Sequence, residues 1–118
     1  MAVEPAEFLL SAEASLAQES EIFWRNAVSR AYYGVFHQAQ ATAKDRGWPE
    51  YAAGATHERL AALYVDQGER ALGYRLKHMH RLRCSADYDI TDGLSLAAAT
   101  DQVVTAKKLA DDVAKLTA

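Results

Sequence analysis

The chain has 118 residues, of which 50% are hydrophobic and 25% are charged, and its formal net charge at pH 7 is −3. This size and composition predict a single globular domain, residues 1–118, that can bury a core of its own, and the acidic balance argues against a generally basic nucleic-acid-binding protein. No uncharged apolar run reaches the roughly 18 residues that a membrane span requires, so we expect no membrane segment.

Two helices are predicted in the first half of the chain. The first covers residues 5–18, because Pro5 suits a first helical turn and apolar residues then recur at helical spacing. The second begins at residue 21 or 22 and continues to about residue 44, and Gly47 marks its end. Residues 45–55 then form the only clear loop that the sequence indicates.

Three more helices are predicted after this loop. Thr56 is the expected N-cap of a helix that ends near Gly68, and the next helix covers residues 69–85, slightly weakened by Gly73. After a turn, a long amphipathic helix starts at residue 94 or 95 and ends at residue 116. Since no segment alternates like a strand, the sequence predicts an all-α fold, an up-and-down bundle of four to five helices.

The second helix carries two chemically different faces. At about 100° per residue, one face is a polar stripe and the opposite face is mostly apolar. The polar stripe consists of Asn26, Arg30, Tyr33, His37 and Gln40. The apolar face consists of Trp24, Ala27, Val28, Ala31, Tyr32, Val35 and Ala39. We therefore expect this helix to contribute both to the core and to a site.

Basic residues concentrate in the middle of the chain. Residues 70–83 contain no Asp or Glu but include Arg70, Arg75, Lys77, His78, His80, Arg81 and Arg83. Two interpretations stay open: a patch that faces phosphate groups, or a solvated helix face paired with acidic neighbours.

The compartment is predicted from cysteine and from the start of the chain. Cys84 is the only cysteine, which excludes an internal disulfide and favours a reducing environment. The first 21 residues hold five Glu and no Lys or Arg, so we expect no cationic leader. A cytoplasmic protein is the resulting expectation.

Two strings together carry a family resemblance. Residues 25–37 read RNAVSRAYYGVFH, and Ala86-Asp87-Tyr88-Asp89 follows Arg83 later in the chain. With the acidic first helix, they resemble a HEPN domain, specifically the small bacterial and archaeal branch often encoded beside a minimal nucleotidyltransferase. The resemblance covers residues 5–116. It implies a helical bundle, a homodimer, and a role in a toxin-antitoxin or defence module with a nucleotidyltransferase partner.

The resemblance also raises the question of RNA cleavage. Many HEPN relatives are metal-independent RNases that use an arginine followed, after four to six residues, by a histidine in a late helix. Here that position holds Arg83 with no histidine downstream, so the motif is degenerate. Two other stretches match the spacing and are the candidate catalytic pairs: Arg30 with His37, and Arg75 with His80.

Each candidate residue has a structural alternative. Arg30 and His37 are about 10 Å apart along a helix axis. In the alternative interpretation, Arg30 is expected to pair with an acid such as Asp87, while Tyr33 and His37 pack at a helix or dimer interface. Arg83 and Asp87 are four apart, which suits a local ion pair as well as a ligand site. The candidate residues for binding nucleotide or RNA are Tyr33, Arg81, Arg83, Asp87 and Tyr88.

Three functions follow from these patterns. The first is a HEPN-type module that binds a nucleotidyltransferase, a nucleotide or RNA. The second is a metal-independent RNase, and the third is a purely structural interaction module. We expect no cofactor and no metal, because His78 and His80 diverge on a helix and no glycine-rich phosphate loop is present.

Overall fold

The computed structural model describes residues 3–49 and 56–117. Within these residues the chain is helical and contains no strand, which confirms the predicted all-α bundle. The elements are α1 (Pro5–Leu16), α2 (Glu21–Asp45), α3 (Thr56–Asp66), α4 (Arg70–Tyr88), α5 (Leu96–Ala114) and a 3₁₀ turn, η1 (Lys115–Thr117). None of the described helices combines the length and the apolar character needed to cross a lipid bilayer.

The predicted boundaries agree with these elements except at some helix ends. Helix α4 continues to Tyr88, three residues beyond the predicted end, and α5 ends at Ala114 in a 3₁₀ turn. Thr56 is the first residue of α3 rather than its N-cap. In the predicted 45–55 loop, residues 50–55 lie outside the described part of the chain.

Local sequence signals explain several helix ends. The Glu7 carboxylate accepts a hydrogen bond of 2.6 Å from the N–H of Glu4, the N-cap residue of α1, as in a capping box. Ser95 caps α5 by accepting a hydrogen bond of 3.1 Å from the Ala98 N–H. Gly47 and Gly68 have φ values of 70° and 89°, a left-handed conformation that lets the chain turn after α2 and after α3.

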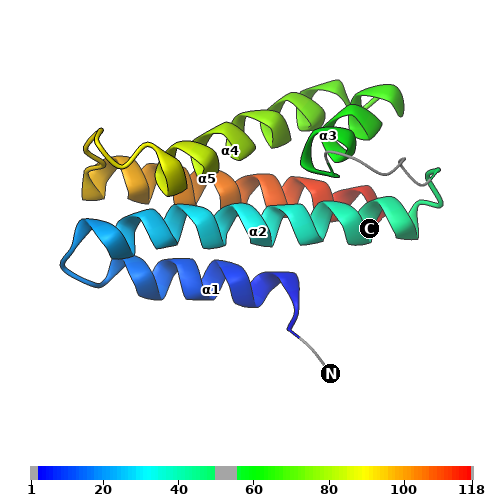
Figure 1. Ribbon diagram of the computed structural model, residues 1–118. Coiled ribbons are helices and arrows are strands. Elements are labelled where there is room, and N and C mark those ends of the chain that lie inside the picture. Colours follow the sequence, from blue (N-terminus) through cyan, green and yellow to red (C-terminus); the bar gives the residue numbers. More distant parts are fainter. Residues whose placement is uncertain (1–2, 50–55, 118) are drawn as a thin grey trace.

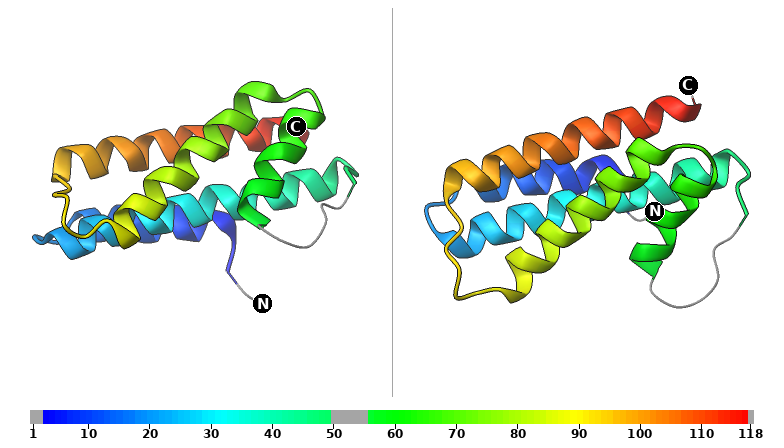
Figure 2. Two further views of the ribbon diagram at one scale, coloured as in Figure 1. Left: turned by 45° about the horizontal axis from the view of Figure 1, so that its top comes forward. Right: turned by 90° about the horizontal axis from the view of Figure 1, so that it is seen from above.

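Helix α2 lies at the centre of the bundle. Figure 1 shows α1 along one side of α2, while α4 and α5 cover other sides. Helix α4 crosses α2 obliquely, and the short α3 packs beside the first half of α4 (Figure 2). Because α3 and α4 are joined by a tight turn, they run in opposite directions and the start of α3 meets the second half of α4.

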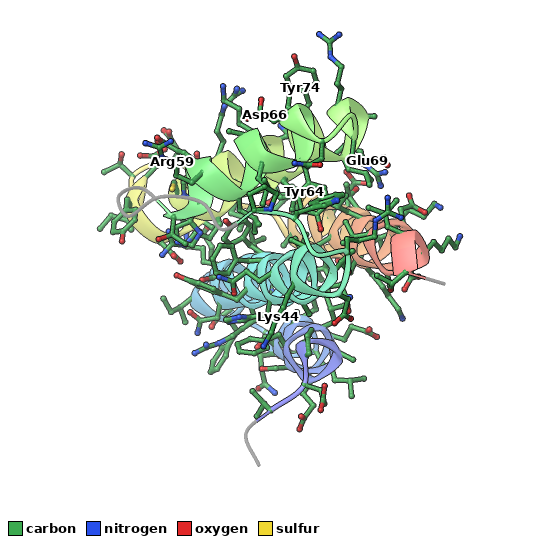
Figure 3. All side chains as sticks on the ribbon, turned by 90° about the vertical axis from the view of Figure 1, so that its right-hand side faces the viewer. Lys44, Arg59, Tyr64, Asp66, Glu69 and Tyr74 are labelled. Carbon is green, nitrogen blue, oxygen red and sulfur yellow. The ribbon has the colours of Figure 1, made fainter. Side chains whose placement is uncertain are left out.

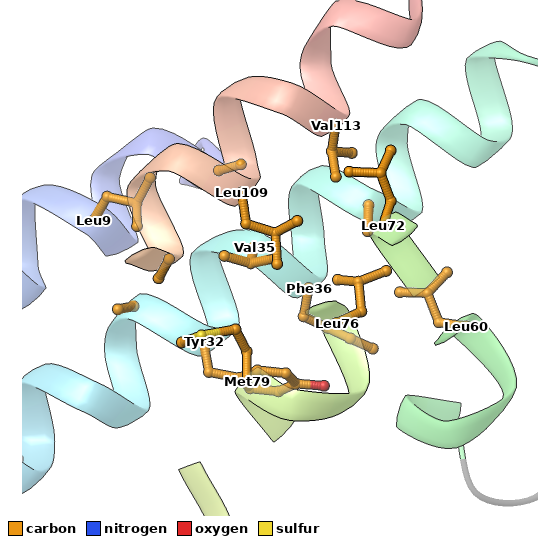
Figure 4. Packing of buried hydrophobic residues seen from close by; sticks show 14 of the residues in the cluster. Leu9, Tyr32, Val35, Phe36, Leu60, Leu72, Leu76, Met79, Leu109 and Val113 are labelled. Atoms are coloured by element: carbon orange, nitrogen blue, oxygen red, sulfur yellow. The ribbon is translucent and has the colours of Figure 1, made fainter. Parts of the chain in front are cut away.

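The core is formed where α2, α4 and α5 face one another, with α1 and α3 closing two sides (Figure 4). Its largest fully buried side chains include Tyr32, Tyr64, Leu60, Met79 and Leu109. The buried Tyr64 hydroxyl donates a hydrogen bond of 2.8 Å to the Ala39 carbonyl. This bond fixes α3 to α2, and the Trp48 ring packs on Tyr64 with 4.8 Å between ring centroids.

A buried arginine ties the end of α4 to the start of α2. Arg25 is only 6% exposed, and its Nε is 2.9 Å from the Glu21 carboxylate. Its guanidinium donates hydrogen bonds to the carbonyl oxygens of Ala86 at 2.9 Å, Asp89 at 3.2 Å and Asp92. Carbonyls at a helix end lack intrahelical donors, so Arg25 supplies them. Because Arg25 donates to a carbonyl in the last turn, α4 continues beyond its predicted end.

Candidate functional site: a groove beside a histidine pair

The first part of the site is an arginine cluster, which we define as Arg83 with Tyr33, Asp87 and Ser29. The Arg83 Nη2 donates a hydrogen bond of 2.8 Å to the Tyr33 hydroxyl, and its Nε lies 2.9 Å from an Asp87 oxygen. The Nε–H is not aligned for a hydrogen bond, so this contact is an ion pair only. The Ser29 hydroxyl donates to the same Asp87 oxygen at 3.2 Å. Residues of the two predicted strings therefore meet in space.

The second part is an imidazole pair, His57 at the start of α3 and His80 in α4. Their rings are stacked, with centroids 4.8 Å apart and planes inclined by 15°. The Tyr32 hydroxyl is 2.6 Å from Nδ1 of His57, and the Cys84 sulfur is 3.5 Å from Nε2 of His80. Both histidines are half-buried. Their edges are thus held by neighbours from α2 and α4 while the pair stays partly open to solvent.

A groove of about 830 Å³ lies on the outer side of the imidazole pair, between α3 and α4. The small or apolar residues in its lining are Ala61, Ala62, Val65 and Gly73. Basic and acidic side chains also line it: Lys77 and Arg81, and Glu58, Asp66 and Asp89. Figure 3 shows Asp66 and the exposed Tyr74, another lining residue, on the outer side of this helix pair. We call this feature the α3–α4 groove.

The electrostatics of the site favour neutral histidines when it holds no ligand. Burial, followed by the charges of His80, Arg83 and His37, lowers the pKa of His57 below its usual value. Burial and the Arg83 charge also lower the pKa of His80, while Glu58 opposes the shift. The pair therefore lies in a positive local field that disfavours adding further positive charge.

The structure places the two candidate Arg–His pairs differently: Arg30 and His37 lie on the same side of α2, next to α1, whereas Arg75 and His80 face different helices. Exposed Arg30 lines a small hollow against α1 together with Phe8, and the His37 ring packs 5.1 Å from the Phe8 ring on the same side. Arg75 is turned toward α5, where its Nη1 lies 2.9 Å from an Asp112 oxygen. His80 faces α3 instead, because five residues rotate it by about 140° around the helix.

The expected pairing of Arg30 with Asp87 is wrong. Asp87 is held by Arg83 from its own helix and by Ser29 from α2, whereas Arg30 lies against α1. The two are separated because Ser29 and Arg30 are adjacent on a helix and so point about 100° apart. The His37 ring packs against Phe8 of α1, and the Tyr33 hydroxyl accepts a hydrogen bond from Arg83 of α4.

The remaining predicted binding residues lie around the site. Arg81 is exposed and lines the α3–α4 groove. Tyr88 is 70% exposed, and the Arg83 guanidinium lies 5.8 Å from its ring centroid. Tyr33 is also in contact with Arg83 through its ring, at 5.2 Å. All five residues that the sequence marked for binding thus come from the neighbourhood of α4 and the facing side of α2.

The stacking of His57 on His80 and the contact of the Tyr32 hydroxyl with His57 were not predicted from the sequence. His57 is the second residue of its helix, and nothing in its immediate neighbours indicates a partner. Tyr32 belongs to the apolar face, and its ring is indeed buried, but its hydroxyl reaches His57. The adjacent pair of tyrosines was the available signal, since a buried tyrosine hydroxyl normally has a hydrogen-bond partner.

Across residues 3–49 and 56–117, no three His, Cys, Asp or Glu side chains are placed together so that they could hold a metal ion. Comparison of the sequence with models of known protein families finds no match, and comparison with curated proteins finds none either.

Proposed function

We propose that this chain binds the phosphate groups of RNA or of a nucleotide in the α3–α4 groove, as a HEPN-type partner module. The observation that carries the proposal is the groove itself: it has a volume of about 830 Å³ and is lined by His57 and His80 and by Lys77 and Arg81, with the carboxylates of Glu58, Asp66 and Asp89 also in its lining. Lysine and arginine bind phosphate by charge, and the apolar part of the lining suits the face of a base.

The biological setting rests on the resemblance of the two strings to HEPN proteins. On that basis we propose a homodimer that acts with a small nucleotidyltransferase in a toxin-antitoxin or defence module. A nucleotidyltransferase gene beside this one is the expected genomic context. The arginine cluster supports the fold of the site in this proposal, because Arg83 is already committed to Tyr33 and Asp87.

Binding is tested with a fluorescent 2′-O-methyl oligouridylate bearing a 5′-hydroxyl, followed by anisotropy. We expect the Lys77→Ala/Arg81→Ala double variant to bind about tenfold more weakly, with a shallower salt dependence, because two phosphate contacts are lost. Displacement of the probe by AMP distinguishes a nucleotide site from one that requires a strand.

The matched control is Lys44→Ala/Lys107→Ala, which removes the same charge elsewhere. Lys44 lies in α2 on the side of the bundle away from Tyr74 (Figure 3), and Lys107 faces Glu13 of α1. Equal losses in the two double variants, or no binding by the wild type at low salt, contradict the proposal.

The imidazole pair favours a second function, metal-independent RNA cleavage. Two histidines near an arginine can deprotonate a ribose 2′-hydroxyl, protonate the leaving oxygen and stabilise the phosphate. If the chain has this activity, RNA is cut in the presence of EDTA to leave a 2′,3′-cyclic phosphate. His80→Ala then reduces the rate at least 100-fold, while His78→Ala, on an exposed part of α4, leaves it unchanged. Intact RNA at high protein concentration excludes this function.

A further inference from the structure

The environment of the imidazole pair differs from that of an ordinary pair of surface histidines. The groups that face the pair from α2 are Tyr32, Tyr33, Phe36 and His37; from α3, Glu58; and from α4, Arg83 and Cys84. In the described residues, neither imidazole forms an ion pair with a carboxylate. Glu58 is the only acid in this set, and it acts on His80 from a distance.

This arrangement makes a second positive charge in the pair unfavourable unless an anion is added. The ring centroids are 4.8 Å apart, so two imidazolium ions would repel each other at short range, and the Arg83 guanidinium adds to the repulsion. A phosphate bound in the groove beside the rings would reverse this balance, because it would attract both imidazolium charges. The pair, whose pKa values are lowered without ligand, would then act as donors to a bound phosphate.

We propose that His57 and His80 form a proton-coupled phosphate subsite at the wall of the α3–α4 groove, so that the ligand binds together with one or two protons. This inference rests on the proposed function and adds its regulation by pH. Lys77 and Arg81 attract the ligand at every physiological pH, whereas the imidazole pair strengthens binding only when protons are available.

The direction of the pH dependence follows from linkage. Without ligand, the pKa of each histidine is below the usual value, and a bound phosphate raises it. Between these two pKa values the complex holds more protons than the free protein, so affinity increases as the pH falls through this interval. The increase is about tenfold per pH unit for each imidazole that becomes protonated on binding. At a pH above both pKa values, the two histidines are neutral in the free protein and in the complex, so the affinity no longer depends on pH.

The experiment measures affinity for the 2′-O-methyl oligouridylate from pH 5.5 to 8.5 at constant salt. Its phosphodiesters keep a single charge over this range, and it cannot be cleaved through a 2′-hydroxyl. We expect the wild type to bind at least about tenfold more tightly at pH 5.5 than at pH 7.5. The His57→Gln/His80→Gln variant should lose this dependence and keep its affinity at pH 8.5 within about threefold, since glutamine does not titrate.

His78→Gln is the matched control, because His78 is exposed on α4 and does not line the groove. It should retain the full pH dependence. A second measurement, NMR titration of the histidine ring protons of the wild type with and without the probe, does not require any variant to fold. The pKa values of His57 and His80 must rise when the probe is bound.

The outcomes separate this inference from the proposed function. Binding with constant affinity from pH 5.5 to 8.5, or unchanged histidine pKa values in the complex, overturns the proton-coupled subsite and leaves groove binding intact. Equal losses of binding in Lys77→Ala/Arg81→Ala and in the control Lys44→Ala/Lys107→Ala overturn the proposal that the ligand binds in the groove. A pH dependence that persists in the double glutamine variant also overturns the role of the pair.

Discussion

Replacing Arg25 by methionine is expected to lower the free energy of unfolding by about 3 kcal/mol, one of the two largest effects that we predict for a single substitution. Arg25 is nearly buried and donates to the carbonyl oxygens of Ala86, Asp89 and Asp92. Methionine retains much of the aliphatic volume but none of the donors. The Ala86 carbonyl in the last turn of α4 and the Asp89 and Asp92 carbonyls in the following turn then lose this donor, and Glu21 loses its counter-ion.

Urea unfolding followed by circular dichroism measures this loss. The control is Arg59→Met, because Arg59 is exposed on α3 and its replacement should change the free energy of unfolding by less than about 0.5 kcal/mol. A similar small change for Arg25→Met would mean that water replaces the guanidinium at the end of α4, and the structural role given to Arg25 would then be wrong.

Gly73→Ala is expected to destabilise the protein by about 2 kcal/mol, although alanine is the better helix former by about 1 kcal/mol. A Cβ atom at this position would lie 2.6 Å from Cγ2 of Val65 and 2.8 Å from the Ala61 carbonyl oxygen. The second neighbour is backbone, so α3 as a whole must shift away from α4. Steric overlap therefore outweighs the gain in helix propensity.

Gly93→Ala provides the comparison, because nothing lies within 4 Å of its would-be Cβ and its φ is not positive. That variant should be neutral or slightly more stable in thermal unfolding, by up to about 1 kcal/mol. If Gly73→Ala is as stable as Gly93→Ala, the close packing of α3 on α4 at this point is contradicted.

The helices could be predicted because their signals are local. Pro5, Gly47 and Gly68 mark ends, and apolar residues at helical spacing mark the buried faces, so the elements and the all-α bundle follow from neighbouring residues. Gly73 shows the limit of this approach. Within its own helix it only lowers helix propensity, whereas in the fold it provides the space in which α3 packs.

The site could be predicted only in part, because its contacts join distant segments. The sequence grouped Tyr33 with one string and Arg83 with the other, and the structure brings them within 2.8 Å. It gave no indication that His57 would stack on His80, since that contact depends on how α3 is oriented. The spacing of Arg75 and His80 suggested a catalytic pair, but the turn of the helix directs Arg75 to Asp112 of α5 and His80 to His57 of α3.

Tyr32 has a consequence for how this protein can diverge. Its ring is buried with the core while its hydroxyl contacts His57 at the groove wall. A replacement without an aromatic ring would alter both the core packing and the contact with His57, whereas phenylalanine would remove only the hydroxyl contact. Descendants that acquire a new ligand are therefore expected to change the outer residues of α4 first and to keep this tyrosine.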